Sequence, residues 1–241
     1  MNNRRFVDKI TESAAIYPHI TFTRKGAVYT CVNPFSYHLV RKNRDVYDGM
    51  DGIYVDGMLM CKFIGLLWRR RIPRLSFDMS GMAVDLFARL DKNAETIYFI
   101  GATQDSVEAS VTQIRKAYPE IHVAGYRNGY FRDDSERNEV IRQIVADNPD
   151  FTVVGMGSPL QEQFALDLRK AGYGGIVFTC GGFLHQTAEG INYYPDWINR
   201  WNLRAFYRLY KEKGLFKRLY NVLIEFPVLF TLDTLRSRRG R

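Results

Sequence analysis

Short apolar runs alternate with segments of helical spacing along the middle of the chain. The apolar runs predict buried strands at residues 96–101, 121–125, 151–155 and 176–180. The segments between them predict helices at residues 105–118, 134–148 and 160–171. Strands that alternate with crossover helices predict an α/β fold, with a Rossmann-like, mainly parallel sheet and helices on both faces.

The first third of the chain predicts a hairpin and two further strand ends. Residues 20–23 and 27–32 alternate in polarity around Arg24-Lys25-Gly26, which is typical of a β-hairpin. Asn33-Pro34 ends the second of these strands, and a short helix is expected over 35–43. A further strand ends at Asp56-Gly57, and an apolar helix is expected to follow it through Trp68.

The strand predicted at 151–155 runs into a glycine turn and then into a helix. Gly155 and Gly157 break the apolar run, Ser158 is a candidate N-cap, and Pro159 is a candidate first helical residue. This geometry aims unpaired backbone N–H groups at an anion. The turn therefore predicts a site for a phosphate or carboxylate.

The charge of the chain is concentrated at its C-terminal end. The 241 residues suffice for one large domain, or for a domain with an appendage. Eleven basic and three acidic residues lie between 197 and 241, and this difference equals the whole net charge of +8. Such asymmetry predicts a polyanionic surface as partner, either anionic lipid or nucleic acid. Three scattered cysteines and the polar start of the chain favour a cytoplasmic protein without a secretory signal.

The C-terminal segment combines apolar, aromatic and basic residues. Its apolar part, within 215–232, is too short and too interrupted for a bilayer span, which needs about 20 apolar residues. The pattern is typical of a helix that lies in the membrane interface. The residues expected to insert are Trp197, Trp201, Leu223, Phe226 and Phe230. The alternative is that the segment closes the core. We expect a core over 1–194 and a membrane-associating appendage over 195–241.

The segment Gly155-Met156-Gly157-Ser158-Pro159-Leu160-Gln161-Glu162 resembles the hallmark Gly-x-Gly-x-Pro-Lys-Gln-Glu of the WecG/TagA/CpsF glycosyltransferase family. The resemblance implies an inverting, metal-independent transferase. It would move an N-acetylhexosamine-type or related sugar from a UDP donor to a polyprenyl-diphosphate-linked saccharide, in bacterial surface polysaccharide synthesis. No cofactor is expected, and the chain has no Asp-x-Asp motif for a metal. Because this acceptor is a membrane lipid, the resemblance also implies a cytoplasmic protein that is peripheral at the inner face of the cell membrane.

The resemblance also identifies candidate site residues. Asp56 matches the family's general base, although Asp51-Gly52 offers the same dipeptide five residues earlier. Candidates for substrate binding are Thr30, Asn33, Arg74, Tyr130, Gly157, Ser158, Pro159, Gln161, Glu162, Gly181, Gly182, His185 and Arg208. Arg74 is a candidate for the donor diphosphate, and Tyr130 for the nucleotide pocket. The chain departs from the family pattern at Leu160, where a lysine is usual, and at His185, where an aspartate is usual.

Two other classes of protein share parts of this pattern. A Rossmann enzyme with another nucleotide cofactor would use Gly-x-Gly-x-x-Gly, but Leu160 stands at the third glycine position. A non-catalytic polyanion-binding protein would explain the basic end. The apolar run 222–230 is more hydrophobic than phosphate tracking requires, so no nucleic-acid partner is expected. A homo-oligomer is compatible with the sequence.

Overall fold

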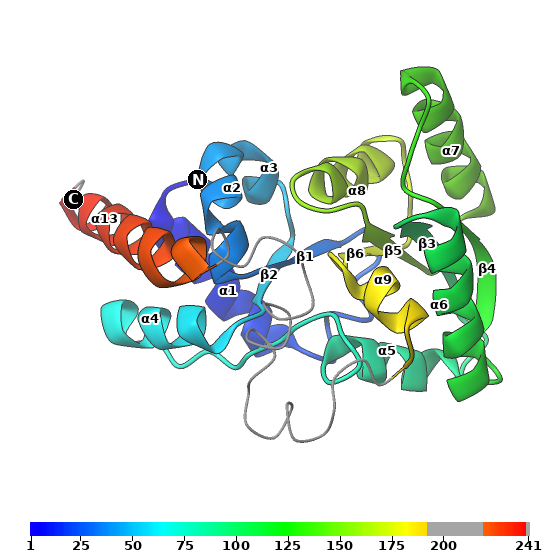
Figure 1. Cartoon of the computed structure of the whole chain (residues 1–241), viewed down its shortest axis with the longest axis horizontal. Coiled ribbons are helices and arrows are strands. Elements are labelled where there is room, and N and C mark those ends of the chain that lie inside the picture. The colour runs from blue at the N-terminus through cyan, green and yellow to red at the C-terminus, as the bar shows by residue number, and fades with distance from the viewer. Residues whose placement is uncertain (192–218, 240–241) are drawn as a thin grey trace.

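The computed structural model describes residues 1–191 and 219–239 and has an α/β fold built on one six-stranded parallel sheet (Figure 1). The strand order is β2-β1-β6-β5-β3-β4, and every neighbouring pair is parallel. The strands are β1 (Val28–Val32), β2 (Gly52–Val55), β3 (Thr96–Gly101), β4 (His122–Arg127), β5 (Phe151–Gly155) and β6 (Ile176–Thr179). The predicted fold class is confirmed.

The helices largely follow the predicted segments. They are α1 (Asn3–Ile16), η1 (Pro34–Ser36), α2 (Tyr37–Lys42), α3 (Arg44–Asp48), α4 (Met58–Trp68), α5 (Met82–Leu90), α6 (Gln104–Ala117), α7 (Asp134–Asp147), α8 (Leu160–Lys170), α9 (Phe183–Ala188), η2 (Asn221–Glu225) and α13 (Phe226–Arg239). The sequence analysis did not identify α1, α3, α5 and α9. The expected domain boundary after residue 194 lies outside the described residues.

The hairpin predicted around Arg24-Lys25-Gly26 is wrong. Residues 17–23 form turns, in which the Arg24 N–H donates to the Ile20 carbonyl at 3.0 Å. β1 instead pairs in parallel with β2 and β6. The polar and apolar alternation of residues 20–23 belongs to a half-buried loop, in which Phe22 is buried against Phe178 and Ile20 is exposed.

The start of α8 also differs from its prediction. Pro159 is the N-cap, the Ser158–Pro159 peptide is cis, and the helix begins at Leu160. The Ser158 hydroxyl does not cap the backbone, because it donates to the Glu162 carboxylate at 3.0 Å.

Alternation along the buried strands divides the core into two clusters, one on each face of the sheet. Ile100 and Val154 point into the cluster with α7 and α8. Phe99 and Val153, one residue earlier, point into the cluster with α5, α6 and α9. This is the pattern of a parallel sheet that is covered on both faces.

The C-terminal helix α13 belongs to the first of these clusters. It packs against α1, α2 and α4, and Phe226 and Phe230 are fully buried. Their rings meet Tyr37 with centroids 5.5 and 5.3 Å apart. The expectation that Phe226 and Phe230 insert into a bilayer is therefore wrong, and the alternative that the segment closes the core holds for these two residues.

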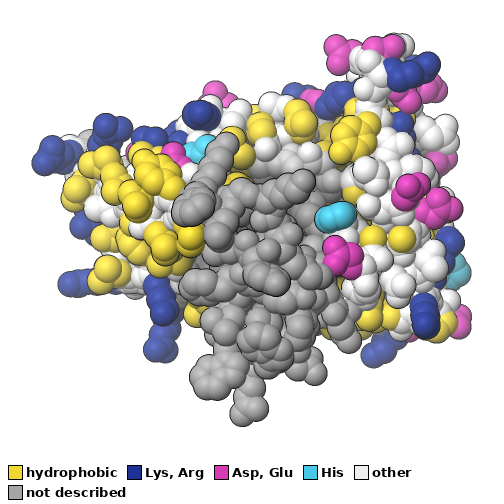
Figure 2. Space-filling view, in the orientation of Figure 1, with side chains coloured by type: hydrophobic (Ala, Val, Ile, Leu, Met, Phe, Trp, Pro, Cys, Tyr) yellow, Lys and Arg dark blue, Asp and Glu magenta, His cyan; other side chains and the backbone are white. Residues whose placement is uncertain are grey.

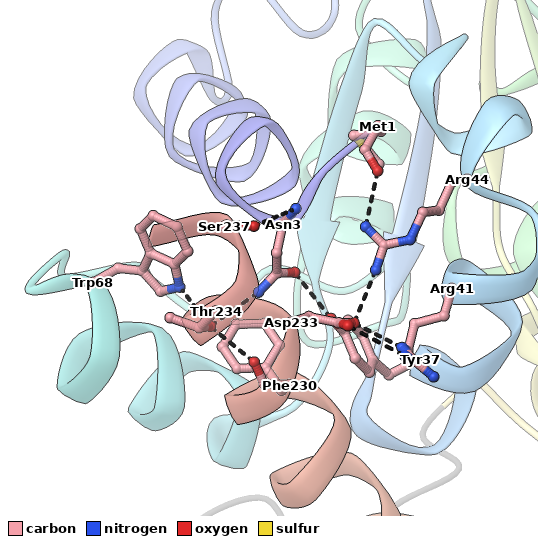
Figure 3. Close-up of polar contacts among 10 residues, drawn as sticks. All are labelled: Met1, Asn3, Tyr37, Arg41, Arg44, Trp68, Phe230, Asp233, Thr234 and Ser237. Atoms are coloured by element: carbon pink, nitrogen blue, oxygen red, sulfur yellow. Dashed lines mark hydrogen bonds and ion pairs between the residues drawn. The ribbon is translucent and has the colours of Figure 1, made fainter. Parts of the chain in front are cut away.

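A buried carboxylate fastens α13 to the helices that follow β1 (Figure 3). Asp233, 4% exposed, accepts from Arg41 Nε at 2.7 Å and from Arg44 Nη2 at 2.8 Å. The Tyr37 hydroxyl adds a third contact to Asp233 at 3.0 Å. Two guanidinium groups and a hydroxyl thus satisfy a charge that would be costly to bury alone.

Neighbouring side chains extend this anchor to α1 and α4 (Figure 3). The Thr234 hydroxyl accepts from Asn3 Nδ2 at 3.0 Å and from Trp68 Nε1 at 3.1 Å, and donates to the Phe230 carbonyl at 2.8 Å. The Asn3 N–H donates to Ser237 Oγ at 3.2 Å. The helix is therefore an integral part of the fold. No helix within the described ranges combines the length and apolar character needed to cross a membrane.

We expect Phe230→Ala to lower the free energy of unfolding by about 3–5 kcal/mol, because it leaves a cavity in the core. Val228→Ala, two residues away on the exposed side of the helix, should change it by about 0.5 kcal/mol or less. Urea unfolding followed by circular dichroism measures both. Equal effects of the two substitutions would show that α13 does not pack as described.

Candidate functional site

The connections that leave β5 and β6 run to opposite faces of the sheet. β5 leads into α8 on one face and β6 into α9 on the other (Figure 1). Ligands of doubly wound sheets bind where such connections diverge. Gly157 and Gly181 lie in these two turns with φ of +77° and +56°, and a Cβ at either position would have no atom of the described residues within 4 Å. Within the described part of the chain, both turns therefore border open space.

Asp56 and Arg74 meet at the carboxyl end of β2. The Asp56 N–H donates to the Val32 carbonyl at 2.8 Å, which continues the pairing of β1 and β2 by one residue. The Leu75 N–H donates to the Val55 carbonyl at 2.9 Å and brings the segment of Arg74 alongside. Arg74 then contacts Asp56 Oδ1 through Nη2 at 2.8 Å and Nε at 3.2 Å.

A second carboxylate, which sequence reasoning missed, lies on the same guanidinium. Arg74 Nη2 is 3.1 Å from Asp78 Oδ2 and 2.9 Å from Ser76 Oγ. The signal in the sequence was the spacing of Arg74 and Asp78, four residues apart in Arg74-Leu75-Ser76-Phe77-Asp78. Burial disfavours the charge of Arg74, but Asp56 and Asp78 outweigh it and hold the pKa of Arg74 above its ordinary value.

Asp51, the other aspartate followed by glycine, lies at the amino ends of the strands, whereas Asp56 lies at their carboxyl ends. It precedes β2 whereas Asp56 follows it, so about 16 Å of extended chain separates the two. Asp51 accepts from the Val28 N–H at 2.9 Å and from Arg169 Nη1 at 2.7 Å. Its carboxylate therefore joins α8 to the amino end of the sheet.

Asn33-Pro34 and Asp56-Gly57 are neighbours in space. Gly57 has φ of +146°, and a Cβ there would lie 2.8 Å from Pro34 Cδ, so this close approach requires glycine. Asn33 Oδ1 accepts from the Ser36 N–H at 2.9 Å and caps η1. The two motifs thus form one corner of the candidate site.

Glu162 is the centre of a buried polar cluster that joins four other predicted site residues. Its Oε1 accepts from Thr30 Oγ1 at 2.9 Å, Ser158 Oγ at 3.0 Å and Gln161 Nε2 at 2.9 Å. Gln161 Oε1 in turn accepts from the Gly181 N–H at 3.0 Å. Because these side chains of Thr30, Gln161 and Glu162 are almost wholly buried, they hold the two glycine turns in place from beneath.

The second oxygen of Glu162 is less well satisfied. Oε2 and the Tyr47 hydroxyl are buried without a hydrogen-bond partner among the described residues. Burial raises the pKa of Glu162 above its ordinary value, although the three hydrogen bonds to Oε1 oppose this shift. We infer that the side chain takes up a proton more readily than an exposed glutamate.

The remaining candidates lie apart from these contacts. Tyr130 follows β4 and is 68% exposed, and His185 is exposed on α9. Gly182 is the N-cap of α9. Arg208 lies outside the described residues. No group of three or more His, Cys, Asp or Glu within 1–191 and 219–239 is placed to hold a metal ion.

We expect Glu162→Gln to preserve or raise the melting temperature at neutral pH. A raised pKa in the folded state means that this group stabilises the fold below its unfolded pKa, near 4.5, and loses that contribution as the pH rises. Since glutamine does not ionise, its advantage over the unmodified chain should grow with pH above about 4.5.

Glu162→Ala is the control, and it should lower the melting temperature at every pH because it leaves Thr30, Ser158 and Gln161 without their acceptor. Thermal unfolding between pH 5 and 9 measures both variants. A glutamine variant that becomes less stable than the unmodified chain as the pH rises would contradict the raised pKa.

Comparison with known proteins gives a match over almost the whole chain. The model of the glycosyl transferase WecG/TagA/CpsF family matches residues 4–240. The chain is 34% identical over 212 residues to UDP-Gal:alpha-D-GlcNAc-diphosphoundecaprenol beta-1,4-galactosyltransferase of Shigella boydii, covering 88% of this chain and 89% of that protein.

Two Bacillus proteins are also similar, and both bear the name N-acetylglucosaminyldiphosphoundecaprenol N-acetyl-beta-D-mannosaminyltransferase. The protein of Bacillus subtilis (strain 168) is 30% identical over 208 residues, which cover 85% of this chain and 79% of the relative. The protein of Bacillus spizizenii is 25% identical over 230 residues, which cover 92% and 86%.

Proposed function

Because the chain belongs to the WecG/TagA/CpsF family of glycosyl transferases, we propose that it moves a hexose or N-acetylhexosamine from a UDP-sugar to an N-acetylglucosamine linked by diphosphate to a polyprenol. The product would serve the assembly of a bacterial surface polysaccharide. The names of the three relatives support this acceptor, because each name includes an N-acetylglucosamine linked by diphosphate to undecaprenol. The observation that carries the proposal is the carboxylate of Asp56 after β2, which lies at the same end of the parallel sheet as the turns at Gly157 and Gly181.

One carboxylate that acts as a general base suffices for a single displacement. The acceptor hydroxyl oxygen attacks the anomeric carbon, Asp56 takes the hydroxyl proton, and the bond from that carbon to the diphosphate breaks. The electron pair leaves with the nucleoside diphosphate, and the configuration at the anomeric carbon inverts. The proposed reaction requires no metal ion.

The donor diphosphate is proposed to lie over the turns at Gly157 and Gly181. Among the described residues, their backbone borders open space, and the first turn leads into α8, whose N-terminus favours negative charge. The cluster around Glu162 supports both turns from within. Tyr130, Gly182 and His185 stay predicted contacts for the substrates, and so does Arg208.

Asp56→Asn should reduce transfer by about 10²–10⁴-fold while UDP binding changes by no more than a few-fold, because the base acts on the acceptor and not on the nucleotide. Transfer of labelled sugar to a polyprenyl-diphosphate acceptor and calorimetry with UDP measure the two effects. Asp51→Asn is the matched control. It should lower the melting temperature, through Arg169 and Val28, and leave the turnover of the folded protein nearly unchanged. The reverse pattern would remove Asp56 from its role.

The acceptor lipid calls for contact with a membrane, and α13 offers a surface for it. The outer side of α13 and of η2 before it is an apolar stripe of exposed residues, Tyr220, Leu223, Ile224, Val228, Leu232 and Leu235, and α4, which packs against α13, adds the exposed Met58 and Leu66. Figure 2 shows hydrophobic side chains gathered over α13 and α4, with Lys and Arg around them. Arg236, Arg238 and Arg239 are exposed at the end of α13. We propose that this surface lies on the anionic inner face of the cell membrane.

Leu223→Gln should weaken binding to anionic vesicles about tenfold, because burial of a leucine side chain is worth about 1.5–3 kcal/mol. Its melting temperature should stay unchanged, since Leu223 is 59% exposed. Ile20→Gln, at an exposed position on the loop after α1, is the matched control and should leave binding unaltered. Vesicle sedimentation at low and high salt measures both. Equal binding by the two variants would show that the stripe is only a solvated face.

A further inference from the structure

We propose that Asp78 is a positioning residue for the transfer reaction, which acts through Arg74 to hold the carboxylate of Asp56 in the orientation of a general base. The inference rests on the proposed role of Asp56. Asp78 needs no contact with either substrate for this role.

Asp78 is itself held firmly by its own loop. Its Oδ1 accepts from the Ser80 N–H at 2.8 Å and from the Ser80 hydroxyl. Its Oδ2 accepts from the Ser76 hydroxyl at 2.7 Å. The turn that contains these residues is closed by the Met82 N–H, which donates to the Ser76 carbonyl at 2.9 Å. The carboxylate therefore has a fixed position from which to bind Arg74.

Asp78 and Ser76 fix the guanidinium together. Arg74 Nη2 lies 3.1 Å from Asp78 Oδ2 and 2.9 Å from Ser76 Oγ. The planar guanidinium is a rigid fork, so fixing Nη2 also fixes Nε. Both nitrogens then contact the same oxygen of Asp56, Oδ1. None of the hydrogen bonds among the described residues uses Asp56 Oδ2, which leaves that oxygen to receive the proton of the acceptor.

Asp78 also shares the guanidinium of Arg74 with Asp56. The two carboxylates together hold the pKa of Arg74 above its ordinary value, so the guanidinium keeps its charge and its contact with Asp56. Among the described residues, the thiols of Cys31 on β1 and Cys61 on α4 also lie near Asp56. Burial raises the pKa of the Cys61 thiol to about 11 and that of Cys31 further, so neither carries charge at neutral pH.

The test is Asp78→Asn, which keeps the shape of the side chain and removes its charge. We expect kcat to fall about 10–100-fold while the KM for the UDP-sugar changes less than threefold, because Asp56 loses its alignment but the nucleotide site is intact. A purely structural role would lower the melting temperature and leave the kcat of the folded protein unchanged.

Two further variants complete the test. In an Arg74→Ala background, Asp78→Asn should cause no additional loss of kcat, because the route through Arg74 is already absent. Asp85→Asn is the matched control, since the Asp85 carboxylate accepts from the Tyr17 hydroxyl and does not contact Arg74, and it should change kcat less than threefold. Should Asp78→Asn fail to fold, Ser76→Ala replaces it, and we expect a fall in kcat because Arg74 loses one of the two groups that fix its guanidinium.

The outcomes separate this inference from the proposed function. If Asp56→Asn abolishes transfer but Asp78→Asn, or Ser76→Ala in its place, leaves kcat unchanged, the positioning role is wrong and the general base stands. If Asp56→Asn retains transfer, the proposed function of that site fails first. Additive losses in the Arg74→Ala background would also overturn the inference.

Discussion

The parallel sheet, buried on both faces, is the constraint on which the rest of the structure depends. Its two faces are filled by two apolar clusters, so polar chemistry is confined to the edges where the strands end. All six strands run the same way, and Asn33, Asp56 and Gly157 therefore gather at one edge although they are far apart in sequence. The same constraint places Asp51 at the opposite edge, where its charge joins helices and strands.

The sequence predicts the strands and the chemistry at their ends because both leave local signals. An apolar run followed by glycine marks β5, and the motif after it identifies Gln161 and Glu162. The same motif does not tell that these two side chains are buried and bonded to each other. The contact between Arg74 and Asp78 depends on a turn whose shape no periodicity predicts. The strand predicted at residues 20–23 was wrong for a related reason, because polar and apolar residues alternate in half-buried loops as well as in strands.

The C-terminal helix has two sides with different tasks. Phe226, Phe230 and Asp233 face the core, and the opposite side carries the apolar stripe that we propose for the membrane. A sequence with apolar residues on both sides of a helix does not show which side is buried, and this is why the expected set of inserting residues mixed the two. The buried pairing of Asp233 with Arg41 and Arg44 decides the orientation.

That pairing also connects the proposed membrane surface with the site. Arg41 lies on α2, and Arg44 is the first residue of α3. Both helices follow Asn33 closely in the sequence. η2, the turn that leads into α13, packs against η1, which Asn33 caps. A surface that rests on a bilayer through α13 is thus fixed to the corner where Asp56 and Asn33 meet. Because the carboxylates of Asp56 and Asp78 already compensate Arg74, positive charge for a lipid diphosphate has to come from elsewhere. The segment between 197 and 241 holds an excess of basic residues equal to the net charge of the whole chain, and it is our candidate for this role.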